Sequence, residues 1–128
     1  MTILGIIPAR GGSKSVPKKN IKELDGKPLL QYTVEAANNA KLLSRVILSS
    51  DDDDIISVAK NLKVDVPFKR PSHLAEDASP TLPVIQHALQ FFKFQNIHFD
   101  AVCLLQVTSP FKTGAFIDAA IKKFIESD

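Results

Sequence analysis

The stretch TILGIIPARGGSK, residues 2–14, decides how this sequence folds. Residues 2–7 are almost wholly apolar and rich in isoleucine, which is typical of a strand buried on both faces of a parallel sheet. Pro8 cannot donate a hydrogen bond to a neighbouring strand, so we expect the strand to end there. Gly11 and Gly12 then permit backbone conformations that leave main-chain N–H groups facing an anion. The pattern predicts an apolar strand that leads into an anion-binding loop.

Fixed positive charge lies in and just after this loop, on Arg10, Lys14, Lys18 and Lys19. The alternative interpretation is an ordinary solvated basic loop. Position favours a ligand site, because loops at the carboxyl ends of strands are where open α/β sheets bind ligands. The glycine spacing matches neither a Walker A loop nor the Gly-x-Gly-x-x-Gly dinucleotide fingerprint. The sequence therefore predicts a phosphate-binding loop and leaves the nucleotide open.

The composition is that of one ordinary soluble domain, with 128 residues of which 45% are hydrophobic and 23% charged. The net charge of +2 is too small to favour nucleic acid or a membrane surface as a partner. No export signal and no run of about 18 apolar residues is present, so we expect neither secretion nor a transmembrane helix. Cys103 lies in an apolar run, where we expect a buried structural thiol and a reducing, cytoplasmic setting.

Strand and helix signals alternate along the rest of the sequence. Further strands are predicted at residues 45–49, 64–68 and 100–106. Helices are predicted from Pro28, after the four aspartates at 51–54, from Thr81 as a cap, and from near Thr113. This alternation predicts an α/β fold with a Rossmann-like, mostly parallel sheet and helices on both faces.

The last predicted helix carries an apolar stripe that we expect to be buried, formed by Phe116, Ile117, Ala120, Ile121 and Phe124. The sequence ends only a few residues later, with no further strand for this helix to lead into. We therefore expect a truncated fold, with an open sheet edge and one exposed helix face.

Three linked motifs are distributed over the whole chain in a specific order and spacing. The first is IPARGGSK at 7–14, continued by Pro17, by KNI at 19–21 and by GKPL at 26–29. The second is Arg70-Pro71 with Leu74-Ala75 and Asp77, and the third is LLQVTSP at 104–110. Together they resemble the acylneuraminate cytidylyltransferases, which are the CMP-sialic acid synthetases and their CMP-sugar-acid relatives. The resemblance implies a fold of the nucleotide-diphospho-sugar transferase type, with residues 1–128 as one nucleotide-binding domain and CTP over the carboxyl ends of the strands.

The resemblance also implies roles for residues of this sequence. It assigns the triphosphate to the loop glycines and to cationic and hydroxyl side chains, namely Arg10, Gly11, Gly12, Ser13, Lys14 and Lys19. The catalytic charges among these are Arg10, Lys14 and Lys19, with Lys19 best placed to meet charge at the α-phosphate. It assigns nucleotide contacts to Asn20, Arg70 and Thr81, with Arg70 on the cytosine side. It assigns the edge of the sugar-acid site to Gln106, Thr108 and Ser109.

The implied reaction transfers CMP from CTP to the anomeric hydroxyl of an acidic nonulosonic sugar and releases pyrophosphate. The resemblance implies Mg²⁺ held by aspartates beyond residue 128, so we expect this chain alone to be inactive. It also implies small-molecule partners and a homodimer of the full-length protein. The sequence departs from the family at Ser15 and Lys18, which stand where glycine is frequent. Val107 replaces a proline and Lys112 an arginine, and a lysine loses the bidentate geometry of an arginine.

Several alternatives stay open. The chain fits another nucleotidyltransferase of the same superfamily, or a non-catalytic nucleotide-binding module. The aspartates at 51–54 have the chemistry of a magnesium site, but acidic residues at a helix start more often act as caps. The histidines share no ligand spacing, so we expect structural or solvent-facing roles for His73, His87 and His98.

Overall fold

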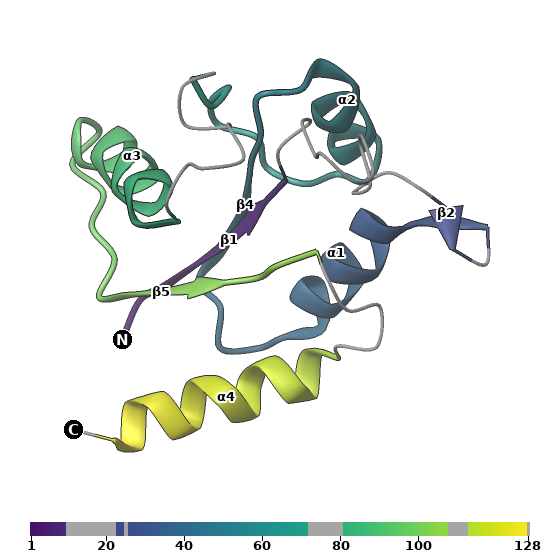
Figure 1. The fold of residues 1–128 in the computed structure, drawn as a ribbon. Helices are drawn as coiled ribbons and strands as arrows, with labels where there is room; N and C mark the ends of the chain where they lie inside the picture. Colours follow the sequence, from purple (N-terminus) through teal and green to yellow (C-terminus); the bar gives the residue numbers. More distant parts are fainter. Residues whose placement is uncertain (10–22, 25, 72–80, 108–112, 128) are drawn as a thin grey trace.

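The structure is a computed structural model that describes residues 1–9, 23–24, 26–71, 81–107 and 113–127. Its centre is a three-stranded parallel sheet in the order β4-β1-β5 (Figure 1). The strands are β1 (Ile3–Pro8), β4 (Arg45–Ser49) and β5 (Ala101–Leu104). The predicted α/β class with a parallel sheet is confirmed.

The central position of β1 follows from its apolar side chains on both faces. Leu4 and Ile6 belong to the core on one side of the sheet, whereas Ile3 and Ile7 belong to the core on the other side. β1 ends at Pro8, as the sequence predicts, and the backbone N–H of the next residue donates to the last carbonyl of β4.

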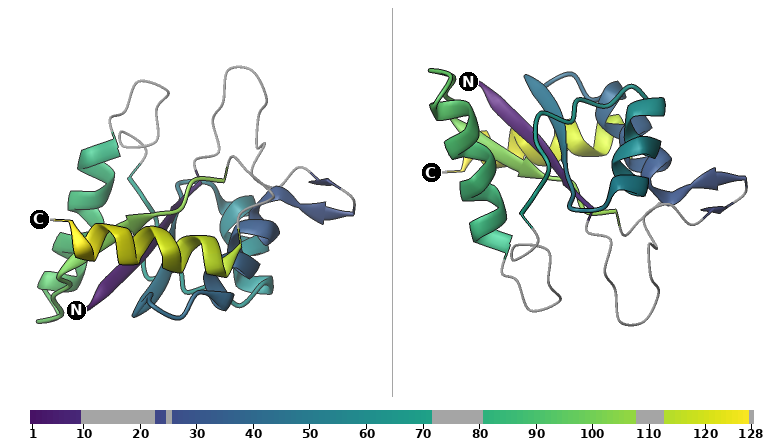
Figure 2. Two further views of the ribbon diagram at one scale, coloured as in Figure 1. Left: turned by 90° about the horizontal axis from the view of Figure 1, so that it is seen from below. Right: turned by 90° about the horizontal axis from the view of Figure 1, so that it is seen from above.

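Four helices cover the sheet within the described part of the chain: α1 (Leu29–Asn39), α2 (Asp53–Asn61), α3 (Thr81–Lys93) and α4 (Gly114–Glu126). Leu30, Ile55 and Ile117 bring α1, α2 and α4 into one core cluster. Ala88 and Phe92 pack α3 against the opposite face. Figure 1 shows the sheet between α3 and the pair α1 and α4, and Figure 2 shows α4 lying across the strands. The predicted helices on both faces are confirmed.

The predicted strand at residues 64–68 is wrong. Only Asp65 forms a bridge there, parallel to Ile47, and its carbonyl accepts a hydrogen bond from the backbone N–H of Leu48 at 2.9 Å. Lys63 has a left-handed backbone with φ of 63°, and Pro67 has no N–H to donate. The segment therefore touches β4 at one residue instead of extending the sheet.

The predicted burial of the α4 stripe is only partly confirmed. Ile117 and Ile121 are buried, but Phe116 and Phe124 are 62% and 61% exposed, and Ala120 is also exposed. The reason is position, because in the described residues α4 packs against α1 and the outer strand β5, which pairs only with β1. An apolar groove lies between α4 and β5. Cys103 on β5 is accordingly half-buried instead of fully buried.

A short hairpin precedes α1. Its strands, β2 (Glu23–Leu24) and β3 (Lys27–Pro28), pair antiparallel around the predicted Asp25-Gly26 turn. Gly26 has a φ of +81°, a conformation that glycine adopts without strain. Pro28 closes the hairpin and is also the residue before the first turn of α1, which agrees with the predicted helix start.

Acidic and hydroxyl side chains accept hydrogen bonds at the amino end of the sheet. Asp100 accepts from the backbone N–H of Thr2 at 2.7 Å, and Ser44 Oγ accepts from that of Ile3 at 2.8 Å. Asp118 of α4 accepts from the backbone N–H groups of Lys41 and Leu42, each at 2.9 Å, in the turn that leads into β4. These contacts fix the strands and α4 at this end. None of the described helices is long and apolar enough to cross a membrane.

Candidate functional site

Polar residues gather where the strands end, at the carboxyl edge of the sheet. Ser49 is the last residue of β4, and it pairs in register with Pro8, the last residue of β1. Ser49 and Ser50 are fully buried, and Arg70 is only 4% exposed. A buried arginine at this edge is unusual for a residue type that is mostly exposed. The carboxyl edge is also where open α/β sheets bind ligands.

The Arg70 side chain is held by Ser49. Its Nε donates to Ser49 Oγ at 3.0 Å, and its Nη2 donates to the Ser49 carbonyl at 2.6 Å. The backbone N–H of Arg70 donates to the Ser50 carbonyl at 2.8 Å. Three contacts therefore join Arg70 to the end of β4. Both side-chain contacts involve a charged donor, which makes them stronger than hydrogen bonds between neutral groups.

The same Ser49 carbonyl accepts a second hydrogen bond, from the backbone N–H of Ala9 at 3.0 Å. Ala9 is buried and directly precedes the predicted phosphate-binding loop. A carbonyl oxygen has two lone pairs, so it satisfies both donors at once. The carboxyl end of β4 thus links the start of that loop to Arg70.

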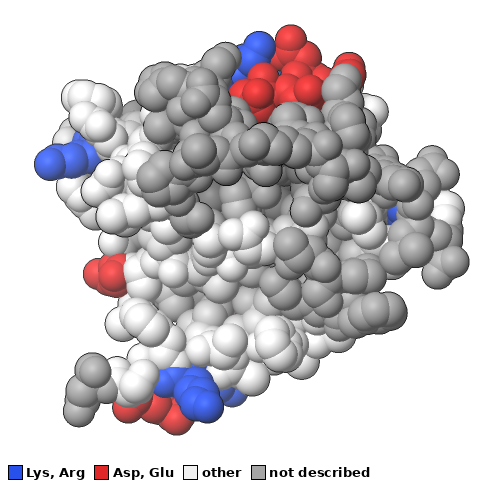
Figure 3. All heavy atoms as spheres, viewed as in Figure 1, with Lys and Arg blue, Asp and Glu red and all other residues white. Residues whose placement is uncertain are grey.

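The aspartates after β4 act as a helix cap, which confirms the capping interpretation. Asp52 Oδ1 accepts from the backbone N–H groups of Asp54 at 2.9 Å and Ile55 at 3.1 Å. Ser50 Oγ accepts from the N–H of Asp52 at 3.1 Å, and Asp53 pairs with Lys69 at 3.1 Å. Figure 3 shows acidic side chains gathered on the surface in this region.

The described residues do not fit a magnesium site. Among them, no group of three or more His, Cys, Asp or Glu side chains is arranged to hold a metal ion. Asp52 serves the amino end of α2, and Asp53 serves an ion pair. These carboxylates are therefore structural groups of the α2 start.

Three of the predicted site residues lie among the described ones. Arg70 is buried at the carboxyl edge, and Gln106 is exposed two residues after β5. α3 begins at Thr81, which is therefore the first residue of the helix, whereas the predicted capping role of Thr81 stays a prediction. The remaining predicted site residues lie outside the described part of the chain: Arg10, Gly11, Gly12, Ser13, Lys14, Lys19, Asn20, Thr108 and Ser109. Gln106 follows the carboxyl end of β5 and Arg70 is hydrogen-bonded to the carboxyl end of β4, so both lie at the same edge of the sheet.

Val107, which replaces a proline of the family, is 4% exposed and belongs to the larger core. An apolar side chain at this position is therefore used for packing. Its neighbour Gln106 is exposed.

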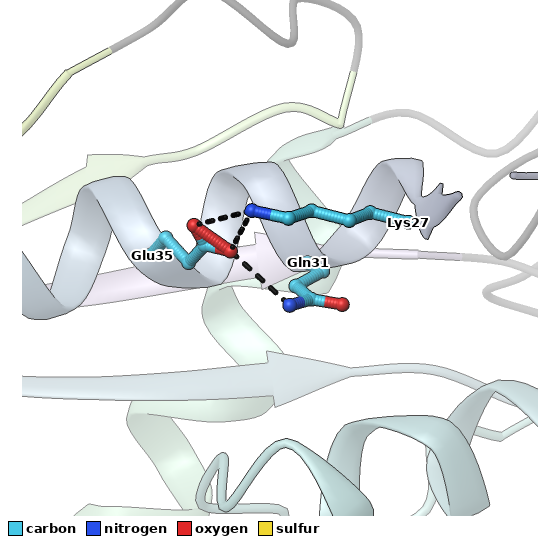
Figure 4. Close-up of polar contacts among 3 residues, drawn as sticks. All are labelled: Lys27, Gln31 and Glu35. Atoms are coloured by element: carbon cyan, nitrogen blue, oxygen red, sulfur yellow. Dashed lines mark hydrogen bonds and ion pairs between the residues drawn. The ribbon is translucent and has the colours of Figure 1, made fainter. Parts of the chain in front are cut away.

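Lys27 of the GKPL motif forms an ion pair with Glu35 at 3.0 Å, and Gln31 donates to Glu35 Oε1 at 3.2 Å (Figure 4). The Lys27 ammonium also lies 5.5 Å from the centre of the Tyr32 ring. The hydrogen bond with Glu35 raises the pKa of Lys27 and lowers the pKa of Glu35. This lysine ties the hairpin to α1, so it serves local structure.

Sequence reasoning missed Ser49. It marks Ser49 only as the end of a strand, whereas the structure makes it the acceptor for Arg70. A hydroxyl residue directly after the apolar residues 46–48 of the strand is the signal that was available. The partner lies 21 residues later, and the sequence carries no pattern for that pairing.

A comparison with family models decides where this chain belongs. The model described as cytidylyltransferase matches residues 4–128. The chain belongs to the cytidylyltransferase family. This membership confirms the resemblance drawn from the three motifs. It also fits a site at the carboxyl edge of the sheet.

Curated relatives agree with the family. The chain is 42% identical to a pseudaminic acid cytidylyltransferase of Campylobacter jejuni, over 99% of this chain and 55% of the relative. It is 38% identical to a CMP-N,N'-diacetyllegionaminic acid synthase of Legionella pneumophila, over 95% of this chain and 53% of the relative. An N-acylneuraminate cytidylyltransferase of Escherichia coli is 37% identical over 95% of this chain and 28% of its own length. This cytidylyltransferase chain thus spans about half the length of the first two relatives.

Solved structures confirm the fold. A CMP:2-keto-3-deoxy-manno-octonic acid synthetase solved with CTP superposes with a TM-score of 0.81 at 18% identity, over 99% of this chain and 48% of that one. A cytidylyltransferase of Leptospira borgpetersenii superposes with a TM-score of 0.75 at 24% identity, over 100% of this chain and 50% of that one. The expected nucleotidyltransferase type of fold is thereby confirmed.

Proposed function

We propose that this chain is the nucleotide-binding part of an enzyme that activates an acidic nonulosonic sugar with CTP. The observation that carries the proposal is Arg70, a buried cation held at the carboxyl edge of the sheet by Ser49. It lies within residues 4–128, which match the cytidylyltransferase family model. The relatives named for pseudaminic and legionaminic acids support this class of sugar.

In the proposed reaction the anomeric hydroxyl oxygen of the sugar attacks the α-phosphorus of CTP. A new P–O bond forms, the bond from the α-phosphorus to the bridging oxygen breaks, and pyrophosphate leaves with its electron pair. The hydroxyl proton passes to solvent or a base. Such transfers depend mainly on positioning and on neutralising charge at phosphoryl oxygens.

The roles of the residues follow the motifs. Arg10, Lys14 and Lys19 bind and neutralise the triphosphate, assisted by Ser13 and the backbone of the loop glycines. Asn20 and Thr81 contact the nucleotide, and Arg70 lies on the cytosine side. The support for Arg70 is its rigid attachment to β4, because a fixed guanidinium costs little reorganisation when a ligand binds. Gln106, Thr108 and Ser109 border the sugar-acid site. Gln106 is exposed at the carboxyl edge of the sheet, which supports this role.

We also propose a dependence on Mg²⁺, with ligands outside residues 1–128, and homodimerisation of the longer protein in the cytoplasm. The metal supplies charge neutralisation at the triphosphate when it is bound. Asp52 serves the start of α2 and Asp53 serves an ion pair, which supports binding without efficient turnover in this chain by itself.

The test is calorimetric titration of the 128-residue chain with CTP, with UTP and ATP as controls. We expect measurable CTP binding and weaker binding of the other nucleotides. In parallel, the chain is incubated with CTP, Mg²⁺ and pseudaminic, legionaminic or sialic acid, and pyrophosphate is measured. We expect little or no release. A CTP affinity no greater than the ATP affinity would reject CTP as the preferred nucleotide. Rapid pyrophosphate release would reject the proposal that the Mg²⁺ ligands lie outside residues 1–128.

A further inference from the structure

We infer that Ser49 is a positioning residue that fixes the Arg70 guanidinium for recognition of the cytosine base. This inference rests on the proposed binding of CTP and adds a residue that no family motif named above contains. Ser49 lies under the site as the last residue of β4 and is fully buried. It therefore acts through Arg70 and not through direct contact with a nucleotide.

The geometry fixes one edge of the guanidinium, the edge that Nε and Nη2 form. Nε is held by Ser49 Oγ at 3.0 Å, and Nη2 is held by the Ser49 carbonyl at 2.6 Å. Two donors fixed on one residue define the plane of the guanidinium, because the group is rigid and flat. The Arg70 backbone is fixed too, through its N–H on the Ser50 carbonyl. The side chain thus has little freedom to turn.

Orientation matters because cytosine and uracil differ at one edge. Cytosine presents two adjacent acceptors, O2 and N3, whereas the N3 of uracil carries a proton and is a donor. A guanidinium fork donates to two adjacent acceptors and is poorly matched to an acceptor beside a donor. A freely turning arginine would bind either base through O2 alone. A fixed arginine therefore favours CTP over UTP.

Ser49 also connects this contact with the phosphate loop. Its carbonyl accepts from Ala9, which immediately precedes Arg10, as well as from Arg70. Because backbone carbonyls persist in any variant, only the Oγ contact is removed by a substitution to alanine. Ser49→Ala consequently removes only the hydrogen bond from Arg70 Nε, and the hydrogen bond from the Ala9 N–H to the Ser49 carbonyl remains.

The chain contains a matched control for this substitution. Ser44 Oγ also accepts one hydrogen bond, from the backbone N–H of Ile3 at 2.8 Å, but at the amino end of the sheet. Ser44→Ala therefore also removes one hydrogen bond accepted by a serine Oγ, at an exposed residue far from the proposed site. A general loss of stability would affect both variants, whereas a positioning role would affect only Ser49→Ala.

The experiment measures CTP and UTP affinities of the 128-residue chain and of both variants by calorimetry, well below their melting temperatures. A second readout is the NMR signal of the Arg70 Nε–H group, assigned by its loss in Arg70→Lys. We expect Ser49→Ala to lower CTP affinity roughly fivefold to tenfold, which is within the range of one typical hydrogen bond, with UTP affinity nearly unchanged. We expect the Nε–H signal to shift and to exchange faster with water. Ser44→Ala should leave the CTP-to-UTP ratio and the Nε–H signal as in the parent.

An unchanged CTP-to-UTP ratio in Ser49→Ala would overturn the inference, as would an equal loss of that ratio in Ser44→Ala. The Nε–H signal separates this failure from failure of the proposed function. If the parent chain binds no nucleotide but the signal still changes in Ser49→Ala, then the anchor is real, and both the nucleotide role and the proposed function are rejected. If the signal does not change, the anchor itself is rejected.

Discussion

Polar side chains satisfy backbone groups of the strands at both ends of the parallel sheet, but different backbone groups are satisfied at each end. At the amino end, Asp100 and Ser44 accept hydrogen bonds from backbone N–H groups. At the carboxyl end, Arg70 donates to the carbonyl and hydroxyl of Ser49. The difference follows from strand direction, because the first N–H groups and the last carbonyls of the strands need partners beyond the ladder.

This difference is consistent with a phosphate-binding site at the carboxyl end of the sheet. Acceptors at the amino end are often carboxylates, so that end gains negative charge. At the carboxyl end the Ser49 carbonyl is satisfied by an arginine, so a fixed positive charge lies there, close to the aspartates at the start of α2. The structural requirement and the proposed binding of an anionic nucleotide thus favour the same residue type at the carboxyl end.

The largest effect is expected from Arg70→Leu. The substitution leaves the buried Ser49 carbonyl and hydroxyl without their charged donor, so we expect the free energy of unfolding to fall by about 2–4 kcal/mol. CTP binding by the chain should be lost as well. Chemical denaturation and calorimetry measure the two effects. Lys69→Leu is the control, because the Lys69 side chain is 57% exposed and pairs with the exposed Asp53. Equal stability of Arg70→Leu and Lys69→Leu would contradict the anchoring of Arg70.

The next effect concerns how closely the start of α4 approaches the end of α1. A Cβ added at Gly114 would lie 2.5 Å from the carbonyl carbon of Asn39, so the two helices could not keep their spacing. We expect Gly114→Ala to lower the free energy of unfolding by about 1–3 kcal/mol through overpacking. Thermal denaturation tests this against Ala115→Ser, a change at an exposed position of the same helical turn. A Gly114→Ala variant as stable as the control would show that the close approach is not required.

Asp118 should make stability depend on pH at the amino end. Hydrogen bonds from the backbone N–H groups of Lys41 and Leu42 lower the pKa of this carboxyl below its usual 3.8. The lowered pKa means that the charged form stabilises the fold above pH 3.8, and that this contribution is lost as pH falls through the folded pKa. We expect Asp118→Asn to melt at a lower temperature at pH 7 and to lose less stability between pH 5 and pH 3 than the parent.

Melting curves between pH 7 and pH 3 check this, with Glu126→Gln at the exposed end of the same helix as the control. An acid-induced loss of stability equal in Asp118→Asn and the parent would mean that this carboxylate does not hold the turn.

The smallest effect is expected from the Lys27 and Glu35 ion pair, which lies at neither end of the sheet. Both side chains are more than 40% exposed, at 43% and 44%, so solvent and salt screen their attraction. We expect Glu35→Gln to leave the melting temperature almost unchanged and CTP binding intact. A large loss of either would mean that this ion pair positions the hairpin for the site.

The fold was predictable where local pattern and burial agree. The apolar runs at residues 3–8 and 45–49 became strands, and Asp52 caps α2 as its position suggests. Predictions failed where contacts with other parts of the fold determine whether a segment pairs or a side chain is buried. Residues 64–68 have a strand-like composition but only one bridge, and Phe116 and Phe124 have helical spacing but no covering layer among the described residues.

The candidate site was predictable only as a set of motifs. The motifs identified Arg70, but its hold on Ser49 depends on a tertiary contact between residues 21 positions apart. The triphosphate loop of the prediction, from Arg10 to Asn20, lies outside the described residues and stays a prediction. The carboxyl end of β4 is therefore the part of the site that rests on structure.

The most direct test of the account is a map of amide NMR shifts during titration of the 128-residue chain with CTP. The account predicts that shifts concentrate at the carboxyl end of the sheet, at Ala9, Ser50, Arg70 and Gln106. It predicts little change at Thr2, Ser44 and Asp100 at the amino end. Shifts concentrated at the amino end, or no shifts at millimolar CTP, would contradict the claim that the carboxyl end binds the nucleotide.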